Sequence, residues 1–99
     1  MKYTKKYKDI KNSKMAFIDE GSGDTFLFLH GNPTSSFLWR NIAPHVEDIG
    51  RIVIPDLIGM GDSDKLEGVD NPGYKYHGQY SYLTALMDAL DLGDNIHLI

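Results

Sequence analysis

Two continuous apolar runs with a helical stretch between them constrain the fold of this chain more than any other feature. Residues 25–29 (TFLFL) and 51–57 (RIVIPDL) carry consecutive apolar positions, as strands do when helices cover both faces of their sheet. A third strand is expected at 95–99, and helices are expected between the strands. Strands that alternate with helices pair in parallel through right-handed crossovers. The order therefore predicts an α/β sheet whose ligand sites lie at the carboxyl ends of its strands.

The two expected helices differ in their patterns. The helix at 76–90 carries apolar residues at i, i+3, i+4 and i+7, which are Leu83, Leu86, Met87 and Leu90. Gly93 is expected to stop it. The helix at about 35–46 has Ser35 or Ser36 as its N-cap and Pro44 near its end. Its apolar face is expected to consist of Leu38, Ile42 and Val46.

An antiparallel edge is expected before these elements. Residues 3–10 and 14–19 alternate well enough to form a hairpin, turned at Lys11-Asn12-Ser13 because Asn tolerates the left-handed region. The lysines of the first strand alternate with apolar and aromatic residues. They are therefore expected on the solvated face of an edge strand.

The composition is ordinary for a soluble globular protein. Of the 99 residues, 41% are hydrophobic and 24% are charged, and a net charge of −4 gives no reason to expect a nucleic-acid partner. The absence of cysteine excludes disulfides and thiolate metal ligands, and no apolar run approaches the length of a membrane span. We expect a soluble protein, cytoplasmic or else periplasmic. A chain this short is expected to be part of a larger α/β domain.

The loop HGNPTSS at 30–36 is the first candidate site. Gly31 permits backbone angles that turn an N–H toward a ligand, and Pro33 biases Asn32 toward extended angles. The side chain and backbone of Asn32 then offer three N–H donors, which form an anion site without net charge. An Asx-turn that caps the strand is the commoner role for such a residue. The local pattern leaves both roles open.

The loop DLIGMGDSDK at 56–65 is the second candidate. Asp64 stands where a dinucleotide fingerprint needs its third glycine, and no helix follows directly, which argues against phosphate binding. Asp56 is either a catalytic carboxylate or, as is commoner, an acid that fixes the glycine turn by accepting backbone N–H groups. The four histidines lack the spacing of metal ligands. No set of residues forms a complete nucleophile, base and orienter.

Four strings carry a resemblance to a known family. FLHGNPTSSFLWRNIAPHVE and RIVIPDLIGMGDSDK resemble the haloalkane dehalogenases of the α/β-hydrolase fold closely, and MAFIDEGSGD and YLTALMDALDLGDNIHLI fit the same family. The resemblance implies that residues 1–99 are the N-terminal portion of one α/β-hydrolase core domain. In such a portion an antiparallel edge hairpin would be followed by parallel βαβαβ, and the cap domain and the C-terminal half would be absent.

The resemblance also implies a reaction and a site. The substrates would be a small halogenated alkane and water, and the products an alcohol and a halide ion. An aspartate nucleophile, an acid and a base would lie downstream, and no metal, cofactor, nucleic acid or membrane would take part. Asn32 would stabilise the halide and supply one oxyanion-hole N–H. His30, Gly31 and Pro33 would shape its loop.

Other relationships are left open by the sequence. Epoxide hydrolases use a similar fold but usually have an aromatic residue at the position of Asn32. Coelenterazine-type luciferases share the HGN loop and the DLIGMG string. A non-catalytic fragment or binding module is the remaining alternative. As a fragment of a haloalkane dehalogenase, the 99 residues are expected to be inactive by themselves.

Overall fold

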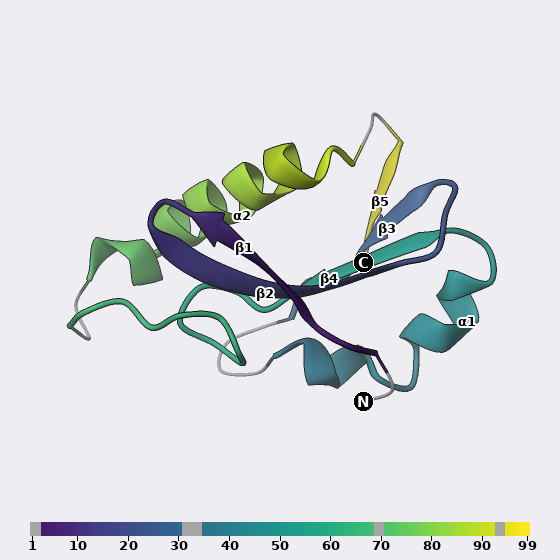
Figure 1. Ribbon diagram of the computed structural model, residues 1–99, viewed down its shortest axis with the longest axis horizontal. Coiled ribbons are helices and arrows are strands. Elements are labelled where there is room, and N and C mark those ends of the chain that lie inside the picture. Colours follow the sequence, from purple (N-terminus) through teal and green to yellow (C-terminus); the bar gives the residue numbers. More distant parts are fainter. Residues whose placement is uncertain (1–2, 31–34, 69–70, 93–94) are drawn as a thin grey trace.

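The computed structural model describes residues 3–30, 35–68, 71–92 and 95–99. Its described strands form one five-stranded sheet in the order β1-β2-β4-β3-β5 (Figure 1). Their bounds are β1 Lys6–Ile10, β2 Ser13–Glu20, β3 Thr25–Leu27, β4 Arg51–Pro55 and β5 Ile96–Leu98. The pairs β1–β2 and β2–β4 are antiparallel, whereas β3 is parallel to both β4 and β5. The predicted α/β sheet with an antiparallel edge is confirmed.

The hairpin of β1 and β2 turns where the sequence predicts. Lys11 and Asn12 both have positive φ, 51° and 67°. Such values suit the tight turns that match the twist of two antiparallel strands. Asn12 adopts this conformation at little cost, as expected, and the hairpin register starts with Ile10 opposite Ser13.

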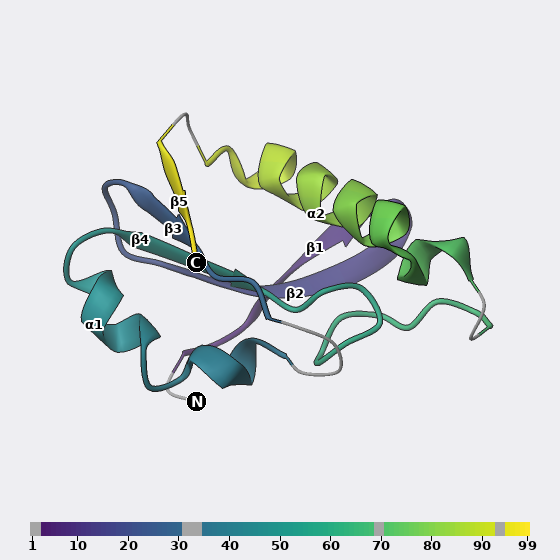
Figure 2. The same cartoon turned by 180° about the vertical axis from the view of Figure 1, so that it is seen from behind.

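Helices cover both faces of the sheet. Helix α2 (Tyr76–Leu90) lies over one face, while the 3-10 helix η1 (Ser36–Trp39) and helix α1 (Ala43–Glu47) lie over the other (Figures 1 and 2). Alternate residues of β4 enter different clusters, since Ile52 and Ile54 pack on the η1–α1 side with Ala43. Val53 packs in a separate cluster with Leu27 and Leu92, which Met87 and Leu90 of α2 partly cover. This alternation explains the continuous apolar runs, because both faces of the strands are buried.

The prediction of one helix over 35–46 is wrong. The chain forms η1, a turn, and then the short α1. In a continuous helix the ring of Pro44 would clash with the carbonyl of Arg40, whereas at the start of α1 its missing N–H costs nothing. The proline therefore divides the segment instead of only weakening its end.

The apolar face expected for that helix is also wrong in part. Leu38 and Ile42 are each 49% exposed. Trp39 and Ala43 pack against the sheet instead, with Val46 at the edge of the same cluster. The turn between η1 and α1 interrupts the helical period predicted from the sequence. The residues that face the sheet therefore differ from the predicted ones. Val46 packs as expected, and the N-cap also forms as expected, since Ser35 accepts the N–H of Phe37.

Helix α2 has the predicted bounds, Tyr76–Leu90. Its buried residue is Leu86, and Leu90 packs at the edge of two clusters. The left-handed residue at its C-terminal cap is Asp91, with φ 51°. The stop predicted at Gly93 lies outside the described residues. Within the described part of the chain, no helix has the length and apolar character required to cross a membrane.

An ion pair fixes the amino end of β4. Arg51 Nε donates to Asp19 Oδ1 at 2.7 Å and Arg51 Nη2 donates to Asp19 Oδ2 at 2.7 Å. The hydrogen bonds to Asp19 are the main cause of the raised pKa of Arg51. Arg51 Nη2 also donates to the carbonyl oxygen of Leu90 at 3.3 Å. The pair thus ties β2, β4 and the end of α2 together, away from the carboxyl ends of the strands.

Candidate functional site

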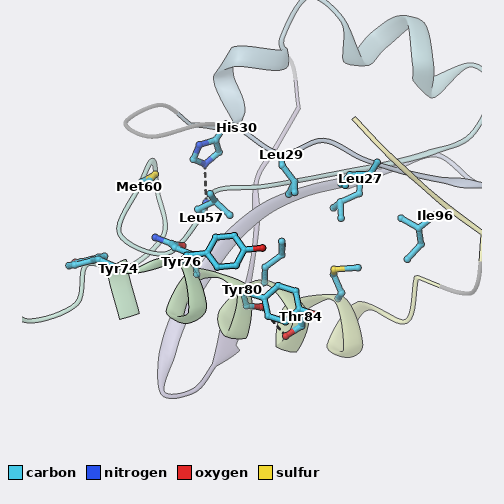
Figure 3. Close-up of a pocket in the computed structure, with 14 residues that line it drawn as sticks. Leu27, Leu29, His30, Leu57, Met60, Tyr74, Tyr76, Tyr80, Thr84 and Ile96 are labelled. Atoms are coloured by element: carbon cyan, nitrogen blue, oxygen red, sulfur yellow. Dashed lines mark hydrogen bonds between the residues drawn. The ribbon is translucent and has the colours of Figure 1, made fainter. Parts of the chain in front are cut away.

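The loops that follow β3 and β4 meet at one edge of the sheet. The N–H of Phe28 donates to the carbonyl of Val53 at 3.0 Å and extends the parallel pairing. Beyond it, the N–H of Leu57 donates to Nε2 of His30 at 3.0 Å (Figure 3). His30 is 5% exposed, and its Nε2 is the acceptor of this bond. The two candidate loops of the sequence, which follow neighbouring strands, are therefore in direct contact at one edge of the sheet, called the rim below.

The centre of the first loop lies outside the described residues. Gly31, Asn32 and Pro33 belong to that stretch, so the halide role of Asn32 and the loop-shaping role of its neighbours stay predictions. The flanking residues are described. His30 accepts the N–H of Leu57 on one side, and Ser35 caps η1 on the other.

Asp56 is the most heavily hydrogen-bonded side chain at this edge. It is completely buried. Its Oδ1 accepts the N–H of Ser36 at 2.7 Å, and its Oδ2 accepts the N–H of Asp62 at 3.0 Å. The same Oδ2 lies 2.6 Å from Nζ of Lys5. The interpretation of Asp56 as an acid that fixes the glycine turn is confirmed, and the turn is only one of the three segments that it holds.

These contacts decide the charge of Asp56. Burial by itself raises the pKa of the carboxyl, because a charge is poorly solvated in the interior. The Lys5 ammonium and the N–H groups of Ser36 and Asp62 oppose this and leave the pKa of Asp56 lowered. For Lys5, burial lowers the pKa, but its bonds to Asp56 and Asp62 outweigh burial and raise it. The pair is therefore ionised over the whole neutral range.

Lys5 is the residue of this edge that the sequence did not reveal. The sequence predicts Lys5 on the solvated face of an edge strand, yet it lies before β1 and its side chain is 19% exposed. Its ammonium reaches both Asp56 and, at 2.7 Å, Asp62. A contact across 51 positions leaves no local pattern. Within the first ten residues, Lys5 looks like any other lysine.

The glycine turn uses its own backbone donors. Gly59 donates to the carbonyl of Asp64 at 2.8 Å, and Met60 donates to the carbonyl of Leu57 at 2.9 Å. Ser63 donates its N–H to the carbonyl of Met60 at 3.1 Å. A phosphate cradle needs such N–H groups to point outward at the ligand. These three N–H groups donate to carbonyls of the loop itself, so they hold its shape and are not aimed at a ligand.

An open apolar groove of about 650 Å³ lies between α2 and the strands β3 and β5 (Figure 3). Its lining is mostly aliphatic and includes Leu27, Leu29, Leu83, Met87, Ile96 and Leu98. Among its polar groups, Thr84 Oγ1 donates to the carbonyl of Tyr80 at 2.9 Å and Gln79 Nε2 donates to that of Ile58 at 3.0 Å. These two donors are therefore already satisfied within the chain. The groove is typical of a surface against which further apolar side chains pack.

A resident metal centre has no basis in the described residues. Among residues 3–30, 35–68, 71–92 and 95–99, no group of three or more His, Cys, Asp or Glu side chains could hold a metal ion. The ring of His97 makes a different contact, stacking on Phe26 with ring centroids 4.8 Å apart.

Comparison with known proteins identifies the fold family. The sequence pattern of the family described as alpha/beta hydrolase fold matches residues 24–99. The chain belongs to the alpha/beta hydrolase fold family. Within this family it is 56% identical, over 93 residues, to a haloalkane dehalogenase of Mycolicibacterium smegmatis. The match covers 94% of this chain and 30% of that protein, so the chain spans about 30% of the length of this relative.

Solved structures of alpha/beta hydrolases agree in fold. The crystal structure of the haloalkane dehalogenase DbeA from Bradyrhizobium elkani superposes with a TM-score of 0.83 at 39% identity, covering 96% of this chain and 32% of that chain. The epoxide hydrolase CorEH superposes with a TM-score of 0.80 at 29% identity, covering 90% and 30%. The predicted resemblance to the haloalkane dehalogenases, as part of an alpha/beta hydrolase sheet, is confirmed.

Proposed function

We propose that this chain is the part of a haloalkane dehalogenase that supplies the halide-side donors. The reaction would replace the halogen of an alkyl halide by hydroxyl, through an alkyl ester on an aspartate that these 99 residues do not contain. The single observation that carries the proposal is a coincidence of sequence and geometry. The described ends of HGNPTSS contact the start of DLIGMGDSDK, because His30 accepts the N–H of Leu57 and Ser36 donates to Asp56.

The chemistry of Asn32 suits a leaving halide. Negative charge develops on the halogen as the carbon–halogen bond breaks, and a carboxamide N–H stabilises it without the full positive charge that would hold the product. A hydrogen bond to a charged partner contributes about 1.5–3 kcal/mol. If it forms only as the charge develops, it is worth roughly ten- to a hundred-fold in rate.

The test is a full-length chimera, in which this chain replaces the matching 93-residue segment of the Mycolicibacterium smegmatis dehalogenase. We expect the chimera to release bromide from 1-bromobutane. Asn32→Ala should lower kcat about ten- to a hundred-fold. Asn41→Ala is the matched control, since Asn41 is exposed in the turn before α1. It should change kcat less than about twofold.

Two results would contradict the proposal. A folded chimera that releases no bromide would show that this segment does not serve a dehalogenase site. A folded chimera in which Asn32→Ala leaves kcat unchanged would remove the halide role of Asn32. The 99 residues by themselves should release no bromide above a buffer blank.

An epoxide hydrolase is the second candidate, because the CorEH fold superposes over 90% of the chain. Its identity of 29% is about half of the 56% shared with the dehalogenase. A second chimera, built in CorEH, separates the two. Hydrolysis of an epoxide to a diol by that chimera, together with an inactive dehalogenase chimera, would favour the second candidate.

A further inference from the structure

The segment 31–35 is bracketed by two hydrogen bonds to neighbouring residues of another loop. Before it, His30 Nε2 accepts the N–H of Leu57 at 3.0 Å. After it, the N–H of Ser36 donates to Asp56 Oδ1 at 2.7 Å. Asp56 and Leu57 are consecutive and directly follow β4. One dipeptide therefore holds both ends of the segment that contains Asn32.

This dipeptide is itself held firmly. The N–H of Asp56 donates to the carbonyl of Ala16 on β2 at 2.8 Å. Its carbonyl accepts the hydroxyl of Ser63 at 2.6 Å, and the Ser63 oxygen accepts the N–H of Ala16 at 2.9 Å. The Asp56 backbone is thus fixed to the sheet and to the glycine turn. The Asp56 carboxylate, held in place in this way, in turn fixes the backbone N–H of Ser36.

Lys5 completes the arrangement from a third direction. Its ammonium lies 2.6 Å from Asp56 Oδ2, which leaves Oδ1 to Ser36. Hydrogen bonds to an ionised acceptor are shorter and about twice as strong as neutral ones. Lys5 keeps Asp56 ionised in a buried site, where an unpaired carboxylate would be costly.

We propose that Asp56 is a positioning residue for the loop 31–35, fixing the end of that loop at Ser36 so that the donors of Asn32 meet the leaving halide. The inference rests on the proposed function for its catalytic consequence. The role of Asp56 is to hold geometry. A displacement of about 1 Å at a reacting centre costs on the order of a hundred-fold in rate, so loosening one end of this loop should be visible in kcat.

Asp56→Asn in the full-length chimera tests the inference. Asn keeps the size of the side chain, but it has one acceptor oxygen and cannot both accept from Ser36 and satisfy Asp62 and Lys5. We expect kcat to fall about tenfold and KM to change less than about twofold, because a misplaced transition-state donor affects kcat. Amide hydrogen exchange in a peptide covering 31–37 should become faster.

Asp19→Asn is the matched control. Asp19 is also a carboxylate in a close ion pair, with two 2.7 Å contacts to Arg51, but it lies at the amino end of β4. It should lower the Tm while leaving kcat and exchange in the 31–37 peptide unchanged. Lys5→Met is the second variant, because the Lys5 ammonium contacts Asp56 Oδ2 at 2.6 Å and Asp62 Oδ2 at 2.7 Å. It should lower kcat about threefold and speed exchange in the same peptide.

The outcomes separate this inference from the proposed function. If Asp56→Asn lowers the Tm as Asp19→Asn does but changes neither kcat nor exchange at 31–37, the inference is overturned. If Asp56→Asn does not fold, Lys5→Met decides by the same two readouts. If the unmodified chimera folds but releases no bromide, the proposed function fails, and the exchange measurement still decides whether Asp56 holds the loop.

Discussion

The ammonium of Lys5 and the carboxylate of Asp56 lie 2.6 Å apart, although 51 positions separate them in the sequence. The carboxylate is fully buried and the lysine side chain is 19% exposed. The chain before β1 is thereby tied to the edge of the sheet where the loops after β3 and β4 meet. This contact gives the edge an electrostatic character that can be tested by pH.

Acid should weaken the edge in a definite range. The pKa of Asp56 is lowered in the folded state, so its ionised form stabilises the fold above the unfolded value of about 3.9. That contribution is lost as the pH falls through the lower, folded pKa. The groups facing Asp56 are the Lys5 ammonium and, beside it, the Asp62 carboxylate.

Denaturant unfolding of the chimera and of its Asp56→Asn variant between pH 7 and pH 2 measures how much ionised Asp56 contributes to the free energy of unfolding. The difference in unfolding free energy should be constant above about pH 5 and should narrow below about pH 4. Lys5, whose pKa is raised, stabilises below about pH 10.4 and loses its contribution only above that. If the difference in unfolding free energy between the chimera and the variant stays constant down to pH 2, Asp56 does not stabilise the fold through its charge.

Two glycines with positive φ should respond differently to alanine. Gly61 has φ 54°, and a Cβ there would lie 2.5 Å from Cγ of Asp56. Gly68 has φ 78°, and among the described residues no atom lies within 4 Å of its added Cβ. Gly68→Ala should cost about 1–2 kcal/mol, the strain of a left-handed residue with a side chain. Gly61→Ala should cost at least about 1 kcal/mol more, because the new methyl also overpacks the site.

Urea unfolding of the two variants in the chimera provides the comparison, and kcat adds a second readout. Because Gly61→Ala pushes on Asp56, it should also lower kcat, whereas Gly68→Ala should not. Equal losses of stability in the two variants would argue that the contact with Asp56 is easily relieved.

The hydroxyl of Tyr74 closes the segment that follows the glycine turn. It accepts the N–H of Leu66 at 2.5 Å and donates to the carbonyl of Leu66 at 2.9 Å. Tyr74→Phe removes both bonds and should cost about 1–3 kcal/mol, because a partly buried backbone amide and carbonyl lose their partner. Tyr7→Phe is the control, since Tyr7 on β1 is 53% exposed; it should change stability by less than about 0.5 kcal/mol. Thermal unfolding of both variants decides, and equal Tm values would contradict the role of Tyr74.

The elements that the sequence predicts well are those governed by local rules. Helix α2 has the predicted bounds because its apolar period runs without interruption and its end needs only one left-handed residue. The hairpin turn at Lys11 and Asn12 follows from the tolerance of Asn for positive φ. The helix expected over 35–46 fails because Pro44 forbids a continuous hydrogen-bond ladder, and a change of phase then moves Leu38 and Ile42 outward.

The sequence by itself determined the α/β class, the position of the two rim loops and the resemblance to the dehalogenases, because apolar period, turn residues and motifs are local properties of the chain. Only the tertiary structure decided that Lys5 reaches Asp56 and that Asp56 and Leu57 hold the two ends of the loop around Asn32. The physical reason is that these contacts join residues 20 to 51 positions apart. They depend on which strands become neighbours, and no periodicity along the chain records that choice.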